Sequence, residues 1–154
     1  MSRVVFVAGN DAAQMLGACL NWARWMAEER GVEIDWAGAL SDWMGKAQAQ
    51  NFLQVVGWDG PEPVAMMEIR ANYNSMLHRT TLYGDHAYVH PDYRNEGVFT
   101  EMADFAMDTG RLIGHKHWIV PVTAGADATA PWLRSVYDRA GFSISGITMH
   151  QGDR

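Results

Sequence analysis

Arg94 and Gly97 stand in a stretch whose spacing suits it to holding a phosphate, AYVHPDYRNEGVF at 87–99. The pattern predicts a strand that ends at Pro91, then a tight loop, and then a helix that opens at Gly97. Backbone N–H groups at the start of a helix have no partner within the helix, and the helix dipole is positive there. The run therefore predicts an anion-binding site, for which a phosphate group is the expected ligand.

The same run resembles the pyrophosphate loop of the GNAT superfamily of N-acetyltransferases, which reads Arg/Gln-x-x-Gly-x-Gly/Ala after a strand ending in Val-x-Pro. Arg94 and Gly97 fill that frame, and the tripeptide 89–91 precedes it. Downstream, VYDRAGF at 136–142 is similar to the family's Leu-Tyr-x-x-x-Gly-Phe close. Because both motifs occur in the family's order and spacing, the chain is identified as a GNAT-like acetyltransferase.

The resemblance implies acetyl-CoA as co-substrate and no metal. The loop and the first helical turn would hold its phosphates, and the main chain of the preceding strand would hold the pantetheine arm and the thioester carbonyl. Such an oxyanion contact is worth about 10²–10³-fold in rate. The implied cofactor contacts are Ala87, Tyr88, Val89, Arg94, Asn95, Glu96, Gly97, Val98, Phe99 and Thr100.

Acetyl transfer to an amine also needs a proton acceptor for the amine and a proton donor for the departing thiolate. The resemblance places Tyr137 beside the sulfur, and a phenol can protonate a leaving thiolate, so Tyr137 is the predicted acid. Strand alternation predicts that Tyr83, Asp85, Ala87 and Val89 share one face. Asp85 is the leading candidate for the base. A turn role for Asp85, and a base that acts through water, remain alternatives.

The predicted acceptor pocket combines aromatic and acidic side chains. Trp22 and Trp25 flank the apolar stripe of a helix predicted at 12–30, and in the resembling family the first two helices commonly wall the acceptor. One of these rings would meet a cation through its face, with simple core packing as the alternative. Tyr83, and Glu68 as a reserve base on the neighbouring strand, complete the pocket.

Charge and composition narrow the partners. The chain carries 18 acidic against 12 basic residues, a net charge of −6, which argues against a broad nucleic-acid footprint and favours a cationic acceptor. Cys19 is the single cysteine, so no internal disulfide forms and a cytoplasmic location is expected. Its place in the helical stripe makes it a core residue and not a nucleophile. The apolar start VVFVAG is too short to span a membrane.

Metal chemistry is not expected. His115 and His117 form a His-x-His pair, but no Cys or carboxylate cluster stands at ligand spacing beside them.

The spacing of apolar residues alternates between helical and strand periods along the chain. It predicts a single mixed α/β domain over 1–154, in the order β-α-α-β-β-β-α-β-α-β. The resemblance implies a central, mostly antiparallel twisted sheet of six to seven strands, flanked by about four helices, with a splayed parallel strand pair holding the cofactor. Ser41 is a candidate cap for the second helix, and Leu112 is expected to point inward. Strands are predicted at 3–8, 52–59, 64–73, 80–90, 117–122 and 143–150, and helices at 12–30, 40–50, 98–112 and 130–140.

These observations predict an N-acetyltransferase that moves an acetyl group from acetyl-CoA to a primary amine by direct attack in a ternary complex. A small cationic amine suits the charge, while a peptide amine or a modified nucleobase remains an alternative, and a homodimer is left open. The rival hypothesis is a catalytically silent acyl-CoA-binding or protein-interaction module on the same scaffold. Its motivation is Phe99 in place of a small loop residue and Ala130 in place of a frequent asparagine.

Overall fold

The computed structural model of the chain describes residues 4–9, 12–49, 51–75, 78–115 and 117–119. The chain divides into two compact units, Met1–Pro121 and Val122–Arg154, and the described residues all belong to the first. The predicted helix at 130–140, the predicted strand at 143–150 and Tyr137 lie outside the described residues. The single-domain organisation stays a prediction.

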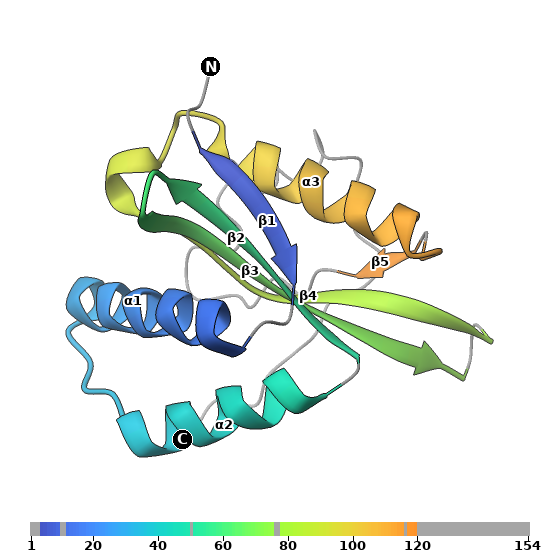
Figure 1. The fold of residues 1–154 in the computed structure, drawn as a ribbon, viewed down its shortest axis with the longest axis horizontal. Helices are drawn as coiled ribbons and strands as arrows, with labels where there is room; N and C mark the ends of the chain where they lie inside the picture. Colours follow the sequence, from blue (N-terminus) through green and yellow to red (C-terminus); the bar gives the residue numbers. More distant parts are fainter. Residues whose placement is uncertain (1–3, 10–11, 50, 76–77, 116, 120–154) are drawn as a thin grey trace, which may run out of the picture. The chain divides into compact units, whose positions relative to one another are not determined.

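The first unit is built on a twisted sheet in which the strands follow chain order (Figure 1). The first four strands pair antiparallel, and the last two pair parallel through Leu82 with Trp118 and Tyr83 with Ile119. The expected mostly antiparallel sheet with one parallel pair is confirmed. The strands in the described part are β1 (Val5–Gly9), β2 (Phe52–Asp59), β3 (Glu62–Asn74), β4 (Arg79–Val89) and β5 (Trp118–Ile119).

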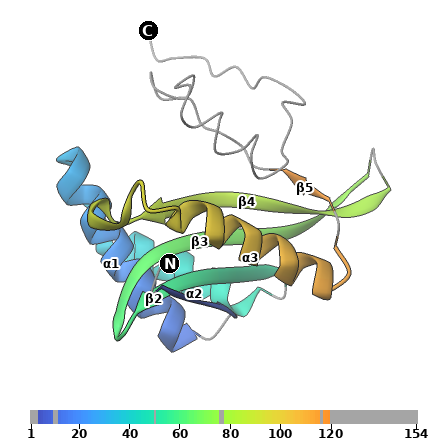
Figure 2. The same cartoon turned by 90° about the horizontal axis from the view of Figure 1, so that it is seen from above.

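Helices cover both faces of this sheet (Figures 1 and 2). On one face, α1 (Ala12–Arg30) and α2 (Trp36–Gln48) pack against Phe52 and Met66 of the sheet. On the other face lies α3 (Val98–Leu112), which follows β4 after the short 3₁₀ helix η1 (Pro91–Tyr93). The link from β4 through η1 to α3 is the predicted phosphate loop, so the fold places that loop at one end of the sheet.

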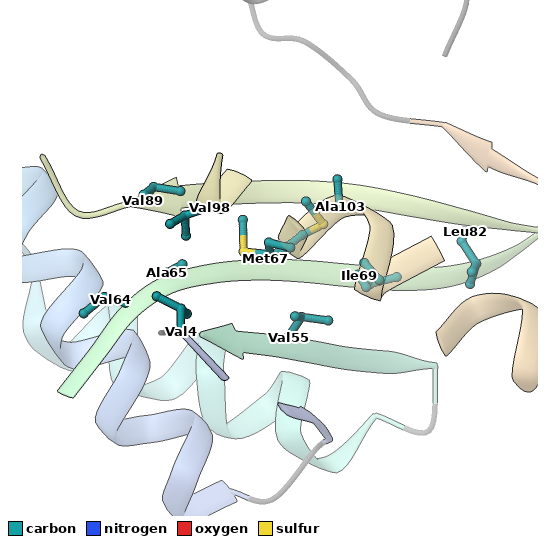
Figure 3. Packing of buried hydrophobic residues seen from close by; sticks show 12 residues of the cluster. Val4, Val55, Val64, Ala65, Met67, Ile69, Leu82, Val89, Val98 and Ala103 are labelled. Carbon is teal, nitrogen blue, oxygen red and sulfur yellow. The ribbon is translucent and has the colours of Figure 1, made fainter. Parts of the chain in front are cut away.

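The core beneath α3 explains why this helix sits where it does. Val98, Met102 and Ala106 are at most 1% exposed and belong to one buried cluster with Met67 and Ile69 of β3, part of which is drawn in Figure 3. These helix positions recur at the period of one buried face. Burying a side chain the size of Met102 contributes about 1.5–3 kcal/mol. The same burial fixes where the loop before α3 must end.

The expectation for Leu112 is wrong, since its side chain is 87% exposed. Gly110 is the last buried position of α3, and a residue two places later is rotated about 200° around the helix, toward solvent. At Gly110 a Cβ would stand 2.7 Å from Leu82 Cδ1, so the helix approaches the sheet too closely there for any larger residue.

The second helix begins earlier than predicted, at Trp36, and Ser41 lies inside it and not at its start. Asp35 is the residue that caps it, because its side chain accepts a hydrogen bond from the Gly38 amide at 3.1 Å. Aspartate is among the strongest helix caps, so this bond outcompetes a start at Ser41. The other predicted elements in the described part agree with the observed ones within a few residues.

A β-bulge in β4 changes which side chains share a face. Glu68 pairs with His86 but Ile69 pairs with Gly84, so Asp85 is an extra residue with no partner in the register. An inserted residue shifts the alternation of the strand beyond it.

The prediction that Tyr83 and Ala87 lie on the same face of β4 is therefore wrong. Ala87 pairs with Met67, whose side chain belongs to the core beneath α3, whereas Tyr83 pairs with Arg70 on the opposite face. Partners in an antiparallel pair point to the same side of the sheet. Tyr83 and Ala87 therefore lie on opposite faces, and it is His86 and Tyr88 that turn toward α1.

Candidate active site

The loop between β4 and α3 is shaped by two residues with positive φ, Asn95 at 67° and Gly97 at 86°. At its start, the Tyr93 amide donates to the His90 carbonyl and the Arg94 amide to the Pro91 carbonyl, which forms the tight corner. The His90 ring accepts a further bond from the Asp92 amide at 3.3 Å, so His90 stabilises the turn. The chain then leaves the corner in the left-handed conformation and enters α3.

Beyond this corner, the backbone amides of residues 95–98 make no hydrogen bond to any described residue. Gly97 precedes α3 without a side-chain cap, and the first helical bond runs from the Glu101 amide to the Gly97 carbonyl at 3.0 Å. A Cβ at Gly97 would meet nothing within 4 Å. Unpaired amides at the positive end of a helix, beside open space, are the arrangement that binds phosphates.

Phe99 follows these amides and occupies the position where the resembling loop carries a small residue. Its side chain is partly buried and packs against the core beneath α3. The bulk of the ring is therefore directed into the protein, away from the amides. Phe99 therefore does not fill the open space before the amides.

The side chain of Arg94 is bonded to other residues of the protein in this structure. Its two terminal nitrogens bond to the two carboxylate oxygens of Glu29 at 2.6 and 2.8 Å, and its Nε donates to the Val89 carbonyl at 2.9 Å. These hydrogen bonds to Glu29 raise the pKa of the Arg94 guanidinium above its usual value. A bidentate pair of this kind fixes geometry, so Arg94 ties the loop to the end of α1 and to the end of β4.

The main chain at the end of β4 offers further polar groups. The His90 amide donates to the Val64 carbonyl of β3, at 2.9 Å. Backbone groups alternate sides along a strand, so those of Val89 and Ala87 point away from β3, and the Val89 carbonyl indeed accepts from Arg94. This outer edge of β4 leads directly into the loop before α3.

Aromatic rings link α1 to this end of β4. Trp25 stacks on Tyr88 with ring centroids 6.1 Å apart and meets the His90 ring edge-on at 4.8 Å. The Tyr88 hydroxyl donates to Glu29 at 3.2 Å, and burial together with the Glu29 charge raises the pKa of Tyr88. Trp25 and Tyr88 thus help to hold the loop.

A second polar cluster lies farther along the same face, between α1, α2 and the sheet. Glu68 of β3 is 1% exposed, and its Oε2 contacts Lys46 Nζ at 3.1 Å and His86 Nδ1 at 3.0 Å. Burial alone would lower the pKa of Lys46, but its bonds to Asp42 and Glu68 outweigh burial and raise that pKa. The Trp22 ring lies 5.8 Å from the His86 ring, between centroids. The structure thus brings Trp22 and Glu68 together around His86.

Sequence reasoning missed His86, Lys46 and Glu29. The pairing of Glu68 with His86 depends on the bulge at Asp85, for which Gly84 inside the predicted strand is only a weak local signal. The bond between Glu29 and Arg94 joins positions 65 residues apart. Gly84 could have suggested a bulge, but no local pattern indicates which distant residues the two pairings join.

Cys19 is fully buried and contacts the Gln54 amide nitrogen at 3.1 Å and Met66. Burial is the main cause that raises its pKa from 9.0 to about 11. A thiol that is neutral at physiological pH and sealed from solvent is not a nucleophile. The expected core role of Cys19 is confirmed.

No group of three or more His, Cys, Asp or Glu side chains among the described residues is arranged to hold a metal ion. No helix in the described part of the chain is long and apolar enough to cross a membrane.

The geometry agrees with what comparison with known proteins finds. The acetyltransferase (GNAT) family matches residues 15–142, so the chain belongs to this family. As a member it is an acyltransferase of the N-acetyltransferase type, with acetyl-CoA as its co-substrate. A search of curated proteins finds no match.

Solved structures show the same fold at low sequence identity. An aminoglycoside acetyltransferase from an uncultured soil metagenome, solved with sisomicin, is 10% identical with a TM-score of 0.75, over 98% of this chain and 95% of that one. The aminoglycoside acetyltransferase AAC(6')-Iy, in complex with a bisubstrate analogue of CoA and acetylneamine, is 12% identical with a TM-score of 0.74, over 99% of both chains. A transcriptional regulator from Bacillus halodurans is 16% identical with a TM-score of 0.76, over 96% of this chain and 99% of that one.

Proposed function

We propose that this acetyltransferase transfers the acetyl group of acetyl-CoA directly to a primary amine of a small cationic molecule, in a ternary complex. The observation that carries the cofactor half of the proposal is the row of unpartnered amides at 95–98, opening α3 beside the bare Gly97. This row would hold the pyrophosphate. Asn95, Glu96, Val98, Phe99 and Thr100 would contribute main-chain contacts.

Arg94 supports this cradle from behind. Because its guanidinium is bonded to Glu29 and Val89, we propose that it holds the loop in shape and adds positive charge at a short distance, without being the main phosphate ligand. The backbone groups of Ala87 and Val89 on the outer side of β4 would hold the pantetheine arm and orient the thioester.

The chemistry then requires only proton transfers by the chain's own residues. The neutral amine attacks the thioester carbonyl carbon, the carbon–sulfur bond breaks, and Tyr137 would give its proton to the departing thiolate. Direct attack is favoured over a route through an acetylated cysteine because Cys19 is buried and its pKa is raised. Asp85 stays a candidate base at the bulge.

The acceptor is proposed from charge and from relatives of the same fold. The net charge of −6 attracts cations. One fold relative was solved with sisomicin and another with an acetylneamine analogue, both of which carry amines. Trp22, Trp25, Glu68 and Tyr83 remain the proposed acceptor side. A homodimer and a cytoplasmic location stay predictions.

The test is isothermal titration with acetyl-CoA, followed by an assay of CoA thiol release over sisomicin, a diamine and a free amino acid. Saturable binding and amine-dependent thiol release would support the proposal. Binding without release for every amine would instead favour the silent acyl-CoA-binding module. Absence of acetyl-CoA binding would overturn both.

A further inference from the structure

Glu68 is an unusual residue for the face of the sheet that it occupies. Its neighbours Met66 and Phe52 are buried and apolar, yet Glu68 is itself 1% exposed and carries a carboxylate. A buried carboxylate costs free energy unless cations or donors compensate it. Both of its described partners, Lys46 and His86, meet the same oxygen, Oε2, and Oε1 is buried without a partner among the described residues.

His86 is the accessible member of this cluster. Its side chain is 53% exposed, whereas those of Lys46 and Glu68 are 24% and 1% exposed. Nδ1 faces Glu68 at 3.0 Å, and Nε2 makes no hydrogen bond to any described residue. A carboxylate beside Nδ1 selects the tautomer that carries its proton there, which leaves the Nε2 lone pair available to a ligand.

The surroundings hold the ring in this position. Trp22 of α1 lies against it with ring centroids 5.8 Å apart at 57°, and Trp43 of α2 packs behind Trp22. Lys46 keeps its charge because its raised pKa lies above that of an ordinary lysine, so Glu68 is compensated without help from a protonated His86.

The position of His86 along β4 places it next to the proposed thioester. It follows the bulge at Asp85 and directly precedes Ala87, whose main chain would hold the pantetheine arm. The bulge is what turns His86 toward α1 while Ala87 stays on the other face. The strand thus presents an imidazole to the acceptor side within one residue of the cofactor strand edge.

We propose that His86 is the catalytic base of the acetyl transfer and that Glu68 is the residue that positions it. This inference rests on the proposed function. Nε2 takes one proton from the acceptor ammonium; the amine then attacks the carbonyl carbon and loses a second proton as the amide forms. One of the two protons ends on the CoA sulfur after the carbon–sulfur bond breaks, and the other is released to water.

The proposal predicts a pH dependence with a definite sign. A protonated imidazole cannot accept a proton, so the wild-type kcat/KM should fall on the acid side of the pH profile. Glu68 from β3 contacts His86 directly, and Lys46 from α2 meets the same oxygen and also pairs with Asp42. Arg70 and Tyr83 form the next ionisable pair on the same face of the sheet. Trp22 from α1 carries no charge.

The experiment compares His86→Gln with Asp85→Asn and with His78→Gln, a matched control in the exposed turn between β3 and β4. Thiol release with sisomicin and acetyl-CoA is measured from acid to neutral pH. We expect His86→Gln to lower kcat by about 10²-fold or more and to abolish the acid limb, with little change in acetyl-CoA affinity. We expect His78→Gln to behave as the wild type.

Glu68→Gln tests the positioning role by a measurement that does not need turnover. Nitrogen-15 NMR of the wild type, with the His86 signal assigned from His86→Gln, should show the neutral ring protonated at Nδ1. In Glu68→Gln this tautomer should lose population, because the acceptor for the Nδ1 proton is weakened.

The possible results distinguish the role of His86 as the base from the proposed acetyl transfer itself. An active wild type whose rate and acid limb survive in His86→Gln would overturn the assignment of His86 and leave the proposed function standing. Loss of the acid limb in Asp85→Asn alone would have the same meaning. A wild type that binds acetyl-CoA but acetylates no amine in the panel would overturn the proposed function, and this inference with it.

Discussion

Replacing Gly97 by alanine separates the strain of the loop from its ability to bind a cofactor. At φ 86° a Cβ is unfavourable by about 1–2 kcal/mol, part of which is offset because alanine also restricts the unfolded chain. The new methyl group meets no protein atom within 4 Å. In the folded protein the methyl group can therefore clash only with a ligand that is bound in front of the amides of residues 95–98.

The magnitude for binding follows from the hydrogen bonds at stake. A hydrogen bond to a charged group is worth about 1.5–3 kcal/mol. Losing one of those between the loop amides and the pyrophosphate would weaken acetyl-CoA binding by about 10- to 100-fold. Isothermal titration measures this directly, and urea unfolding of the same sample gives the stability.

Gly60→Ala is the matched control. Gly60 also has a positive φ, 59°, and open space around its Cβ position, but it lies in the turn between β2 and β3. We expect a comparable loss of stability with unchanged acetyl-CoA affinity. If Gly97→Ala were to bind acetyl-CoA as tightly as Gly60→Ala, the loop amides would not be the phosphate site.

Three further changes test other parts of the structure. Tyr137→Phe should slow thiol release by about 10²-fold or more with little effect on acetyl-CoA affinity, and an unchanged rate would refute its role as the acid. Glu29→Gln should reduce the free energy of unfolding by less than about 1 kcal/mol, because its pair with Arg94 is partly exposed, and the loss measured in urea should shrink at high salt. Folding raises the pKa of Cys19 from 9.0 to about 11, so its stabilising contribution is present below pH 9 and is lost as the pH rises toward 11. The free energies of unfolding of the wild type and of Cys19→Ala, plotted against pH, should therefore converge or cross between pH 9 and about 11. Parallel curves would contradict the raised pKa of Cys19.

The shape of the loop between β4 and α3 was predictable because its information is local. A strand, a proline corner, a glycine and an amphipathic helix follow one another within a few residues, and each constrains the backbone of its neighbours. Gly97 does adopt positive φ, and α3 does begin at Val98 as predicted. The buried position of Cys19 was equally readable, from the 3.6-residue period of its helix.

The sequence by itself therefore determined the order of the elements in the described part, the family and the shape of the loop before α3, all of which depend on neighbouring residues. The tertiary structure decided which side chains meet. A single extra residue at Asp85 reversed the faces of β4, brought His86 to Glu68 and separated Tyr83 from Ala87. Likewise Arg94 met Glu29 only because α1 packs beside the end of β4. Contacts between distant segments are set by register and packing, which a one-residue shift changes completely while leaving every local pattern intact.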